Sequence, residues 1–316
     1  MPDTKIPTEA EILGYVQSLS NWGRWGDDDQ LGTVNHISSE HRKKAASLVK
    51  DGVAVSCARL ITTEIAPDIR SQFIHYMTGS GEGYTPNPDM NTLRTTGSGD
   101  FIGMAFHGNF ITHLDSLCHM FWNGHMYNGR PSSMVTTREG ATAESIELLK
   151  DGVVSRGVLL DAVRHRGVDW MESGQGVMPH ELEEMEAKQG VNVEPGDILL
   201  IRTGHYKRRM ESGPRPVSDG FPGVHASCMP WIHEKGVAVL GGDSVNDVVP
   251  CGYPNLSQPF HQIAMPHMGL WLLDNCNFEE LAMACAEKQR WEFLLTIAPL
   301  RIQYGTGSPV NPIAMF

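Results

Sequence analysis

The 316-residue sequence predicts an α/β protein that forms one domain over residues 1–316. Apolar strand-like runs alternate with helical periodicity along its second half, as in α/β folds. No repeat of the roughly 20–50 residues typical of repeat arrays and no low-complexity linker divides the chain. The composition, 41% hydrophobic and 20% charged residues, is typical of a globular protein large enough to build its own core.

Residues 1–50 are predicted to form a helical extension that packs on the domain, with helices at residues 8–19 and 38–50. Serines supply an N-cap for the second helix, and Asp51 and Gly52 end it. A strand is expected at residues 53–60. Residues 67–99 are rich in Gly, Pro, Ser, Thr and Asn, which predicts a long surface segment able to cover a pocket.

The second half of the chain carries the alternation that predicts the fold class. Helices are expected at residues 139–150, 179–189, 227–235 and 279–289, and strands at residues 156–162, 197–203, 237–241 and 292–300. Neither GxGxxG nor GxxxxGK[ST] occurs, so no phosphate cradle for a nucleotide cofactor is recognisable.

The charge balance and the apolar runs limit the partners. The chain has 25 Lys+Arg against 37 Asp+Glu, a net charge of −12, so a nucleic-acid partner is not expected. No apolar run approaches the roughly 20 residues of a membrane helix, so no membrane partner is expected either. Without a recognisable secretory signal, a cytoplasmic location is expected. Six cysteines without a CxxC pair suit reduced thiols.

Histidine and aspartate concentrate in residues 107–119. His113 and Asp115 are two residues apart, so in an extended strand both side chains leave the same face and can converge on a divalent cation such as zinc or manganese. His119 follows Asp115 by four residues and suits a further ligand or a general base. His107 lies roughly 20 Å from His113 along a straight strand. It joins the site only if the chain bends at residues 108–109, which Gly108 permits.

The alternative for each of these histidines is an ordinary core or surface residue satisfied by hydrogen bonds. Three histidines and an aspartate within thirteen residues favour a shared site, because burying so many polar groups costs free energy unless they are paired or ligated.

Three further features have both a functional and a structural interpretation. Trp22, Trp25 and Trp122 form an aromatic wall for a planar substrate, or they are plain core. Asp243 and Asp247 follow an apolar strand, where sites gather in α/β sheets, or they cap loops. Cys118 beside His119 allows a thiol nucleophile, although free cysteines are commonly buried and inert.

Residues 112–119, Thr-His-Leu-Asp-Ser-Leu-Cys-His, resemble the T-H-x-D-x-x-x-H core of the bacterial cyclase-like metal-dependent hydrolases, a family that includes kynurenine formamidase and isatin hydrolase. The similarity extends through residues 21–26, 31–33, 127–129, 242–244 and 305–312, and the terminal segments resemble its longer branch. The resemblance implies a swivelling β/β/α cyclase-like fold, a Zn2+ or Mn2+ site, and a homodimer or homotetramer. By matching, His113 and Asp115 are ligands and His119 is the catalytic base or a second-site ligand.

The sequence departs from the family pattern at one position. The formamidase type has a histidine four residues before the T-H-x-D histidine, where this chain has Asn109. Either His107 takes that role through a shifted backbone, or the metal site is weaker or altered. The resemblance also makes His261 and Asp274 candidates to complete the active site, although His267 can end a helix and Asp274 can cap the next one.

The expected function is a metal-dependent hydrolase that cleaves an amide, a cyclic amide or a lactone of a small organic substrate. The predicted metal ligands are His107, His113 and Asp115, and the predicted catalytic residues are His119 and His261. The predicted substrate-binding residues are Trp22, Trp25, Trp122, Asn109 and Asp274. The alternatives are a catalytically silent small-molecule-binding protein on the same fold and a cysteine hydrolase that uses Cys118 and His119.

Overall fold

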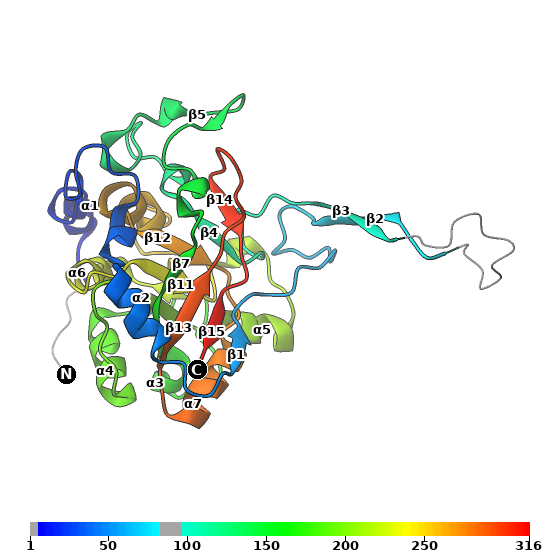
Figure 1. Cartoon of the computed structure of the whole chain (residues 1–316). Coiled ribbons are helices and arrows are strands. Elements are labelled where there is room, and N and C mark those ends of the chain that lie inside the picture. Colours follow the sequence, from blue (N-terminus) through cyan, green and yellow to red (C-terminus); the bar gives the residue numbers. More distant parts are fainter. Residues whose placement is uncertain (1–5, 83–96) are drawn as a thin grey trace, which may run out of the picture.

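The computed structural model describes residues 6–82 and 97–316 and shows a mixed α/β fold around a curled sheet of nine strands. The strand order is β1-β15-β13-β7-β9-β11-β12-β4-β14. The central strands β7, β9, β11 and β12 are parallel, and antiparallel strands extend the sheet on both sides. Figure 1 shows helices to the left of this sheet and below it, with its C-terminal strands at the front.

The sheet consists of β1 (Ala54–Ser56), β4 (His113–Asp115), β7 (Val153–Asp161), β9 (Ile198–Arg202), β11 (Val239–Gly242), β12 (Trp271–Asp274), β13 (Glu292–Ile297), β14 (Gly307–Pro309) and β15 (Ile313–Met315). Three two-stranded sheets pair β2 (Ile74–Gly79) with β3 (Gly99–Gly103), β5 (Val135–Thr136) with β6 (Gly140–Ala141), and β8 (Gly176–Val177) with β10 (Gly223–Val224).

The helices are α1 (Glu9–Ser18), α2 (Ser39–Ala46), α3 (Ala162–Arg166), α4 (Pro179–Gln189), α5 (His205–Ser212), α6 (Met229–Glu234) and α7 (Glu279–Lys288). A π-helix, η8 (Phe260–Met268), precedes β12. The short 3-10 helices are η1 (Gly32–His36), η2 (Leu117–His119), η3 (Tyr127–Gly129), η4 (Ser132–Met134), η5 (Ile146–Leu149), η6 (Val217–Asp219) and η7 (Ala226–Cys228).

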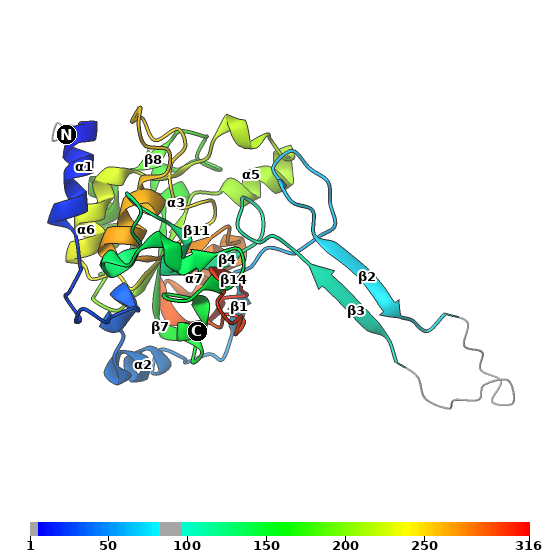
Figure 2. The same cartoon turned by 90° about the horizontal axis from the view of Figure 1, so that it is seen from above.

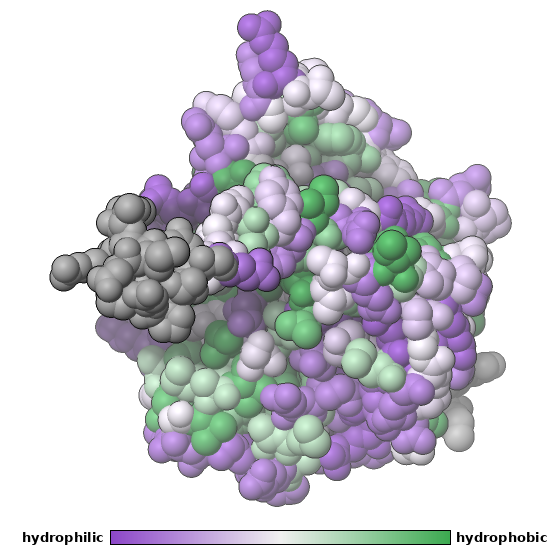
Figure 3. Space-filling model, turned by 90° about the vertical axis from the view of Figure 1, so that its right-hand side faces the viewer, coloured by the Kyte–Doolittle hydropathy of each residue, from purple (hydrophilic) through white to green (hydrophobic). Residues whose placement is uncertain are grey.

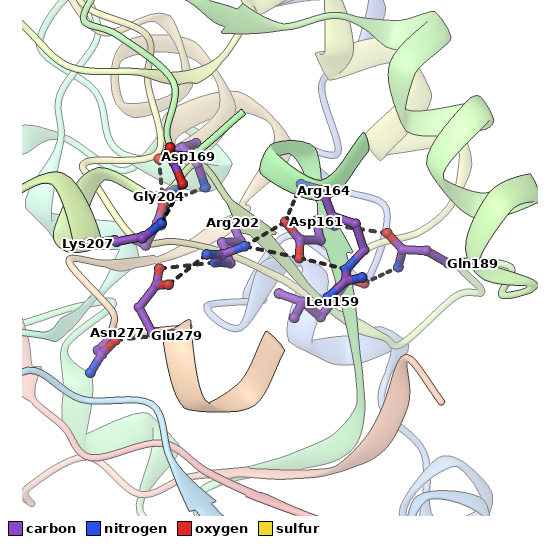
Figure 4. A network of polar contacts seen from close by, with 12 residues as sticks. Leu159, Asp161, Arg164, Asp169, Gln189, Arg202, Gly204, Lys207, Asn277 and Glu279 are labelled. Atoms are coloured by element: carbon purple, nitrogen blue, oxygen red, sulfur yellow. Dashed lines mark hydrogen bonds and ion pairs between the residues drawn. The ribbon is translucent and has the colours of Figure 1, made fainter. Parts of the chain in front are cut away.

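The apolar core follows the parallel strands, whose side chains are buried on both faces of the sheet. Helices α2 and α4 pack against β7, and α1 packs against η8. A polar network at the end of β7 and β9 joins these strands to two helices (Figure 4): Arg202 donates to both carboxylate oxygens of Asp161 at 3.0 and 3.1 Å and to Glu279 at the start of α7. The network thereby ties α3 and α7 to the end of the sheet at which the site residues gather.

Most predicted elements are present, and α4 has the predicted bounds. The predicted helix at residues 139–150 is wrong. The chain there forms β6 and η5, because Glu144 takes a left-handed backbone conformation (φ 55°) that interrupts a helix. The helix expected at residues 38–50 ends at Ala46. Among the described residues, α5 is one of the elements that were not predicted. The π-helix η8 ends one residue after His267, which was given as a possible helix end, and β12 ends at Asp274.

The segment predicted at residues 67–99 contains two strands, and residues 83–96 of it lie outside the described part. Strands β2 and β3 form a ribbon that projects from the body instead of folding over it (Figures 1 and 2). Its apolar side chains are exposed, including Ile74 at 55% and Ile102 at 57%. Figure 3 views the face from which the ribbon projects and shows further apolar side chains near its base. The described ribbon does not cover a pocket, but the start of the same segment does border one, because Arg70 lines the cavity at the site described below.

Candidate metal centre

The site lies where β4 enters the sheet between β12 and β14. Antiparallel pairing sets Asp274 opposite His113 and Leu272 opposite Asp115. The η2 turn directly after β4 carries His119, and η8 carries His261. Residues far apart in the sequence therefore meet at one end of the sheet.

Asp115 is the centre of this cluster and is fully buried. Its Oδ1 lies 2.8 Å from Nδ1 of His107 and 3.3 Å from Nε2 of His113, and its Oδ2 lies 3.5 Å from Nε2 of His261. Nevertheless, neither carboxylate oxygen accepts a well-directed hydrogen bond from the described residues. A buried carboxylate without such donors costs free energy unless a cation is present.

His107 reaches Asp115 because the chain bends at residues 108–110. The Nη1 of Arg59 donates to the carbonyl of Asn109 at 3.1 Å, and Nδ2 of Asn275 donates to the carbonyl of Gly108 at 2.7 Å. The His107 ring stacks on the His119 ring, with the ring centres 3.8 Å apart. His107 therefore lies beside the carboxylate, as it must if it takes the role of the family histidine that Asn109 replaces.

The tautomer of His113 is set by its backbone. Nδ1 lies 2.8 Å from the carbonyl of Ile111 and donates to it, so in the neutral imidazole Nε2 presents its lone pair toward Asp115. Nε2 of His107 lies 2.9 Å from the hydroxyl of Thr306, which leaves Nδ1 toward the same carboxylate. In metal sites, one ring nitrogen of a ligating histidine points at the ion, beside the carboxylate ligand. The other ring nitrogen is held by a hydrogen bond, as it is here.

The His261 side chain lies between three carboxylates. Nδ1 is 2.7 Å from Asp247, and Nε2 is 3.3 Å from Oδ2 of Asp274. Asp247 also accepts a hydrogen bond from the backbone N–H of Phe260 at 2.8 Å, so it holds the start of η8 as well as the imidazole. Asn246 donates to the other oxygen of Asp274 at 2.5 Å. The apolar strand that precedes Asp247 pointed to a site or a loop cap there, whereas no sequence pattern indicated a role for Asn246.

Two groups of donors in this cluster have the size of a cation site. One comprises His107, Asp115 and His119, and the other comprises His113, Asp115 and Asp274. Within each group the ligand atoms lie within 4.8 Å of one another, and Asp115 belongs to both. Imidazole nitrogens with carboxylate oxygens are ligands that zinc and manganese accept. The donor set, together with the unsatisfied Asp115 oxygens, fits one or two divalent cations.

The electrostatics of the cluster follow from burial and from these contacts. Burial lowers the pKa of His119 to about 4, so its imidazole is neutral near pH 7. Burial by itself would raise the pKa of Asp115, but His119 and His113 hold that pKa well below its usual range. Asp115 is therefore a carboxylate and His119 a neutral imidazole, the protonation states in which both bind metals.

A cavity of about 650 Å³ opens onto the cluster. One part of its lining consists of the five ligand candidates His107, His113, Asp115, His119 and Asp274, together with His261. This part is called the floor of the cavity. Apolar side chains form one part of its wall: Met120, Val217, Phe221, Val245 and Val249. Asn109, Ser218, Ser257, Gln258 and Arg70 contribute polar groups. The cavity therefore offers a ligating floor, an apolar wall and a polar rim.

The predicted tryptophans lie elsewhere. Trp22 stacks on His267 with ring centres 5.3 Å apart, and Trp122 lies 6.1 Å from the same ring. Trp25 contacts His36. None of the three is among the described residues that line the cavity, so the expected aromatic wall is corrected to an aliphatic one with Phe221. Instead, Trp22 and Trp122 lie against η8, and Trp25 lies against η1.

The surroundings of Asn109 and Cys118 bear on the roles expected for these two residues. Asn109 lines the cavity, and its buried Oδ1 has no hydrogen-bond partner among the described residues. Cys118 is fully buried, and burial raises the pKa of its thiol to about 12. A thiol of that acidity supplies almost no thiolate near neutral pH, so the cysteine-hydrolase alternative is not supported.

The comparisons with known proteins place these observations in a family. A family model described as "Putative cyclase" matches residues 34–246. A solved structure of a novel cyclase is 33% identical, with 95% of this chain and 99% of that chain covered and a TM-score of 0.85. No curated protein matches the chain.

More distant solved structures share the fold. Isatin hydrolase A from Labrenzia aggregata, bound to benzyl benzoate, is 18% identical over 88% of this chain and 98% of that chain, with a TM-score of 0.58. A predicted metal-dependent hydrolase from Bacillus stearothermophilus is 15% identical over 84% and 98%, with a TM-score of 0.53. The family model covers more than half of the sequence, and the nine-stranded sheet matches these neighbours. The chain therefore belongs to the cyclase family.

Proposed function

We propose that this protein is a metal-dependent hydrolase that cleaves an amide, cyclic amide or lactone bond of a small organic compound. The observation that carries the proposal is the buried Asp115 carboxylate, which faces imidazole nitrogens and accepts no directed hydrogen bond from the described residues. The fold-level likeness to isatin hydrolase and to a predicted metal-dependent hydrolase supports it by analogy.

The donor groups define which residues hold the metal. His107, Asp115 and His119 form one set, and His113, Asp115 and Asp274 form the other, with Zn2+ or Mn2+ as the ion. A bound divalent cation lowers the pKa of a water molecule and polarises a carbonyl group. In this proposal His119 acts as a ligand, the second of the two roles expected from its position.

His261 is the residue suited to move a proton. Asp247 holds its Nδ1 at 2.7 Å, and Nε2 faces the floor of the cavity. Burial alone would lower the pKa of His261, but Asp274, Asp115 and Asp247 raise it well above its usual value. A cation held by Asp115 and Asp274 would offset their charge, so that Nε2 could accept a proton from water and return it to the leaving group. The apolar wall around Phe221 contacts the body of the substrate, and Asn109 offers its carboxamide as a hydrogen-bond partner.

Metal removal combined with a substrate screen tests the function. A chelator first removes metal from the protein, which is then reloaded with Zn2+ or Mn2+ and analysed for metal content. Each preparation is assayed with formanilide, isatin and phthalide, which are probes for amide, cyclic amide and lactone cleavage. We expect at least one probe to be hydrolysed, with activity lost on chelation and restored by one of the ions. Undiminished hydrolysis by protein verified as metal-free contradicts the proposal.

The alternative function, a catalytically silent binding protein, was suggested because Asn109 stands where the family has a ligand histidine. That argument is weaker now, because His107 lies beside Asp115. A homodimer or homotetramer remains part of the proposal. The exposed apolar side chains of the β2–β3 ribbon are a surface that such an assembly can bury.

A further inference from the structure

A single cationic side chain stands at the rim of the site cavity. Among the described lining residues, Arg70 is the one lysine or arginine. It is exposed, and the described part of the chain offers it no ion pair or hydrogen bond. The other charged lining residues, Asp115 and Asp274, lie with the histidines on the floor. The lining of the cavity thus combines the candidate metal ligands with one exposed guanidinium that is unpaired within the described part of the chain.

The backbone that carries Arg70 is anchored to the site. Two residues earlier, the buried Asp68 receives two hydrogen bonds from Arg209 of α5, through Nε at 2.5 Å and Nη2 at 3.2 Å. The N–H of Ile69 closes a turn onto the carbonyl of Ala66 at 3.0 Å. Arg70 therefore projects from a fixed turn, which limits the positions that its guanidinium can occupy.

The same anchor touches the loop that shapes the metal centre. The guanidinium of Arg209 lies over the Phe110 ring, 4.6 Å from its centre, and Phe110 follows Asn109 directly. Asn109 and Arg70 line a second small pocket together, as well as the main cavity. The rim cation is thus held beside the loop that borders the candidate metal ligands.

We propose that Arg70 binds an anionic group of the substrate, a carboxylate that remains free while the amide or lactone carbonyl reacts at the floor. The guanidinium fork pairs with a carboxylate through two parallel hydrogen bonds. In a protein with a net charge of −12, an unpaired cation at a cavity mouth also attracts anions locally. The substrate class is therefore an anionic amide or lactone whose apolar body contacts the apolar lining of the cavity.

This inference deepens the proposed function and rests on it, so the test uses matched probes that separate the two. One pair is formanilide and 4-formamidobenzoate, and the other is phthalide and 5-carboxyphthalide. The chain variants are Arg70→Gln, Arg70→Lys and, as a control, Arg138→Gln, which removes an exposed arginine outside the lining of the cavity. All are assayed with metal loaded and metal content verified.

We expect the native chain to prefer the anionic member of a pair. Arg70→Gln should lower kcat/KM for that member about 10- to 100-fold, mainly through KM, because a hydrogen bond to a charged group is lost. The neutral member should be unaffected, Arg70→Lys should retain part of the preference, and Arg138→Gln all of it. Equal losses for both members, or no preference in the native chain, overturn the assignment of Arg70.

A binding measurement decides the inference even if no probe is hydrolysed, an outcome that counts against the proposed function only. Benzoate and benzene-1,4-dicarboxylate are titrated into the metal-loaded native chain and into Arg70→Gln by calorimetry. Both ligands can place one carboxylate at the floor, but only the dicarboxylate has a second for the rim. We expect a tenfold or greater preference for the dicarboxylate that disappears in Arg70→Gln. The same preference in both proteins refutes the inference.

Discussion

Nδ1 of His261 donates a hydrogen bond to the buried Asp247 across 2.7 Å, and this contact directs Nε2 toward Asp115 and Asp274. Asp247 also accepts backbone hydrogen bonds from residues 260 and 261, so one carboxylate fixes the π-helix and the imidazole together. A π-helical turn is uncommon and is frequently found at functional sites. The geometry makes the orientation of His261 depend on a residue outside the ligand groups.

Asp247→Asn should therefore impair turnover more than metal binding. The amide can accept only through one oxygen and also presents a donor, so the tautomer and orientation of His261 are less well defined. We expect kcat to fall about 10- to 100-fold with metal content retained. Stopped assays on the best probe and elemental analysis measure the two effects, and Asp219→Asn on an exposed turn is the control. If the variant lost metal to the same extent as activity, Asp247 would instead have a role in metal binding.

His107→Ala and Asn109→Ala distinguish the two alternatives for the ligand preceding His113. Nδ1 of His107 lies 2.8 Å from the shared carboxylate, whereas Asn109 lies in neither donor group. We expect the histidine variant to bind metal at least about tenfold more weakly, and the asparagine variant to keep its metal and change KM instead. Competition with a chromogenic chelator gives the affinities. The reverse order would assign the ligand to Asn109.

Asp115→Asn should remove metal from both donor groups, because Asp115 is the residue they share. The variant replaces a charged donor by a neutral one at a fully buried position. We expect metal content below one tenth of the native value after dialysis, with activity lost in proportion. Far-ultraviolet circular dichroism establishes that the variant is folded. Native metal content in a folded Asp115→Asn protein argues against the shared site.

Glu144 provides a pH-dependent stability test away from the metal centre. Burial raises the pKa of its carboxyl to about 8, despite Arg130 at 3.3 Å. A carboxyl whose folded pKa exceeds its unfolded value contributes stability at low pH, and this contribution is lost as the pH rises from about 4.5 through 8. Glu144→Gln keeps an acceptor for Arg130 and has no proton to lose.

The variant should equal the native protein near pH 5 and exceed it in stability by roughly 1–3 kcal/mol near pH 8, the cost of an incompletely satisfied buried group. Thermal unfolding between pH 5 and 9 measures the difference, and Glu139→Gln, at an exposed position, should show no such trend. A stability difference that does not change with pH would show that Glu144 keeps an ordinary pKa.

The β2–β3 ribbon offers a test of the proposed assembly. An isolated two-stranded ribbon is only marginally stable in water, and this one exposes Ile102 at 57% and Tyr76 at 54%. We expect the native protein to have the mass of a dimer or tetramer by light scattering, and the double variant Tyr76→Ser, Ile102→Ser to dissociate more readily on dilution. Leu300→Ser, another exposed apolar position, is the control. A monomeric native protein contradicts the expected assembly.

Local sequence signals predicted the elements that depend on local chemistry. Helix α4 begins at Pro179, a residue suited to the first helical turn, and ends at Gly190 in a left-handed conformation (φ 65°), so its bounds were readable in advance. The two-residue spacing of His113 and Asp115 in β4 likewise predicted that both would reach one site. Glu144 shows the limit: its backbone is left-handed inside a helical pattern, and its N–H donates to Oε1 of Gln30, 114 residues earlier, a contact that no local pattern reveals.

By itself, the sequence determined the α/β class, the family and the core of the donor cluster, since these depend on periodicity and on residues close together in the chain. Only the tertiary structure decided that His107 reaches Asp115, that Asp247 orients His261 and that the tryptophans lie outside the cavity. The physical reason is the distance along the chain: the bend at His107 is held by Arg59 and Asn275, 50 and 167 residues from the carbonyls they bind. Such contacts exist only where the folded sheet brings distant segments of the chain together.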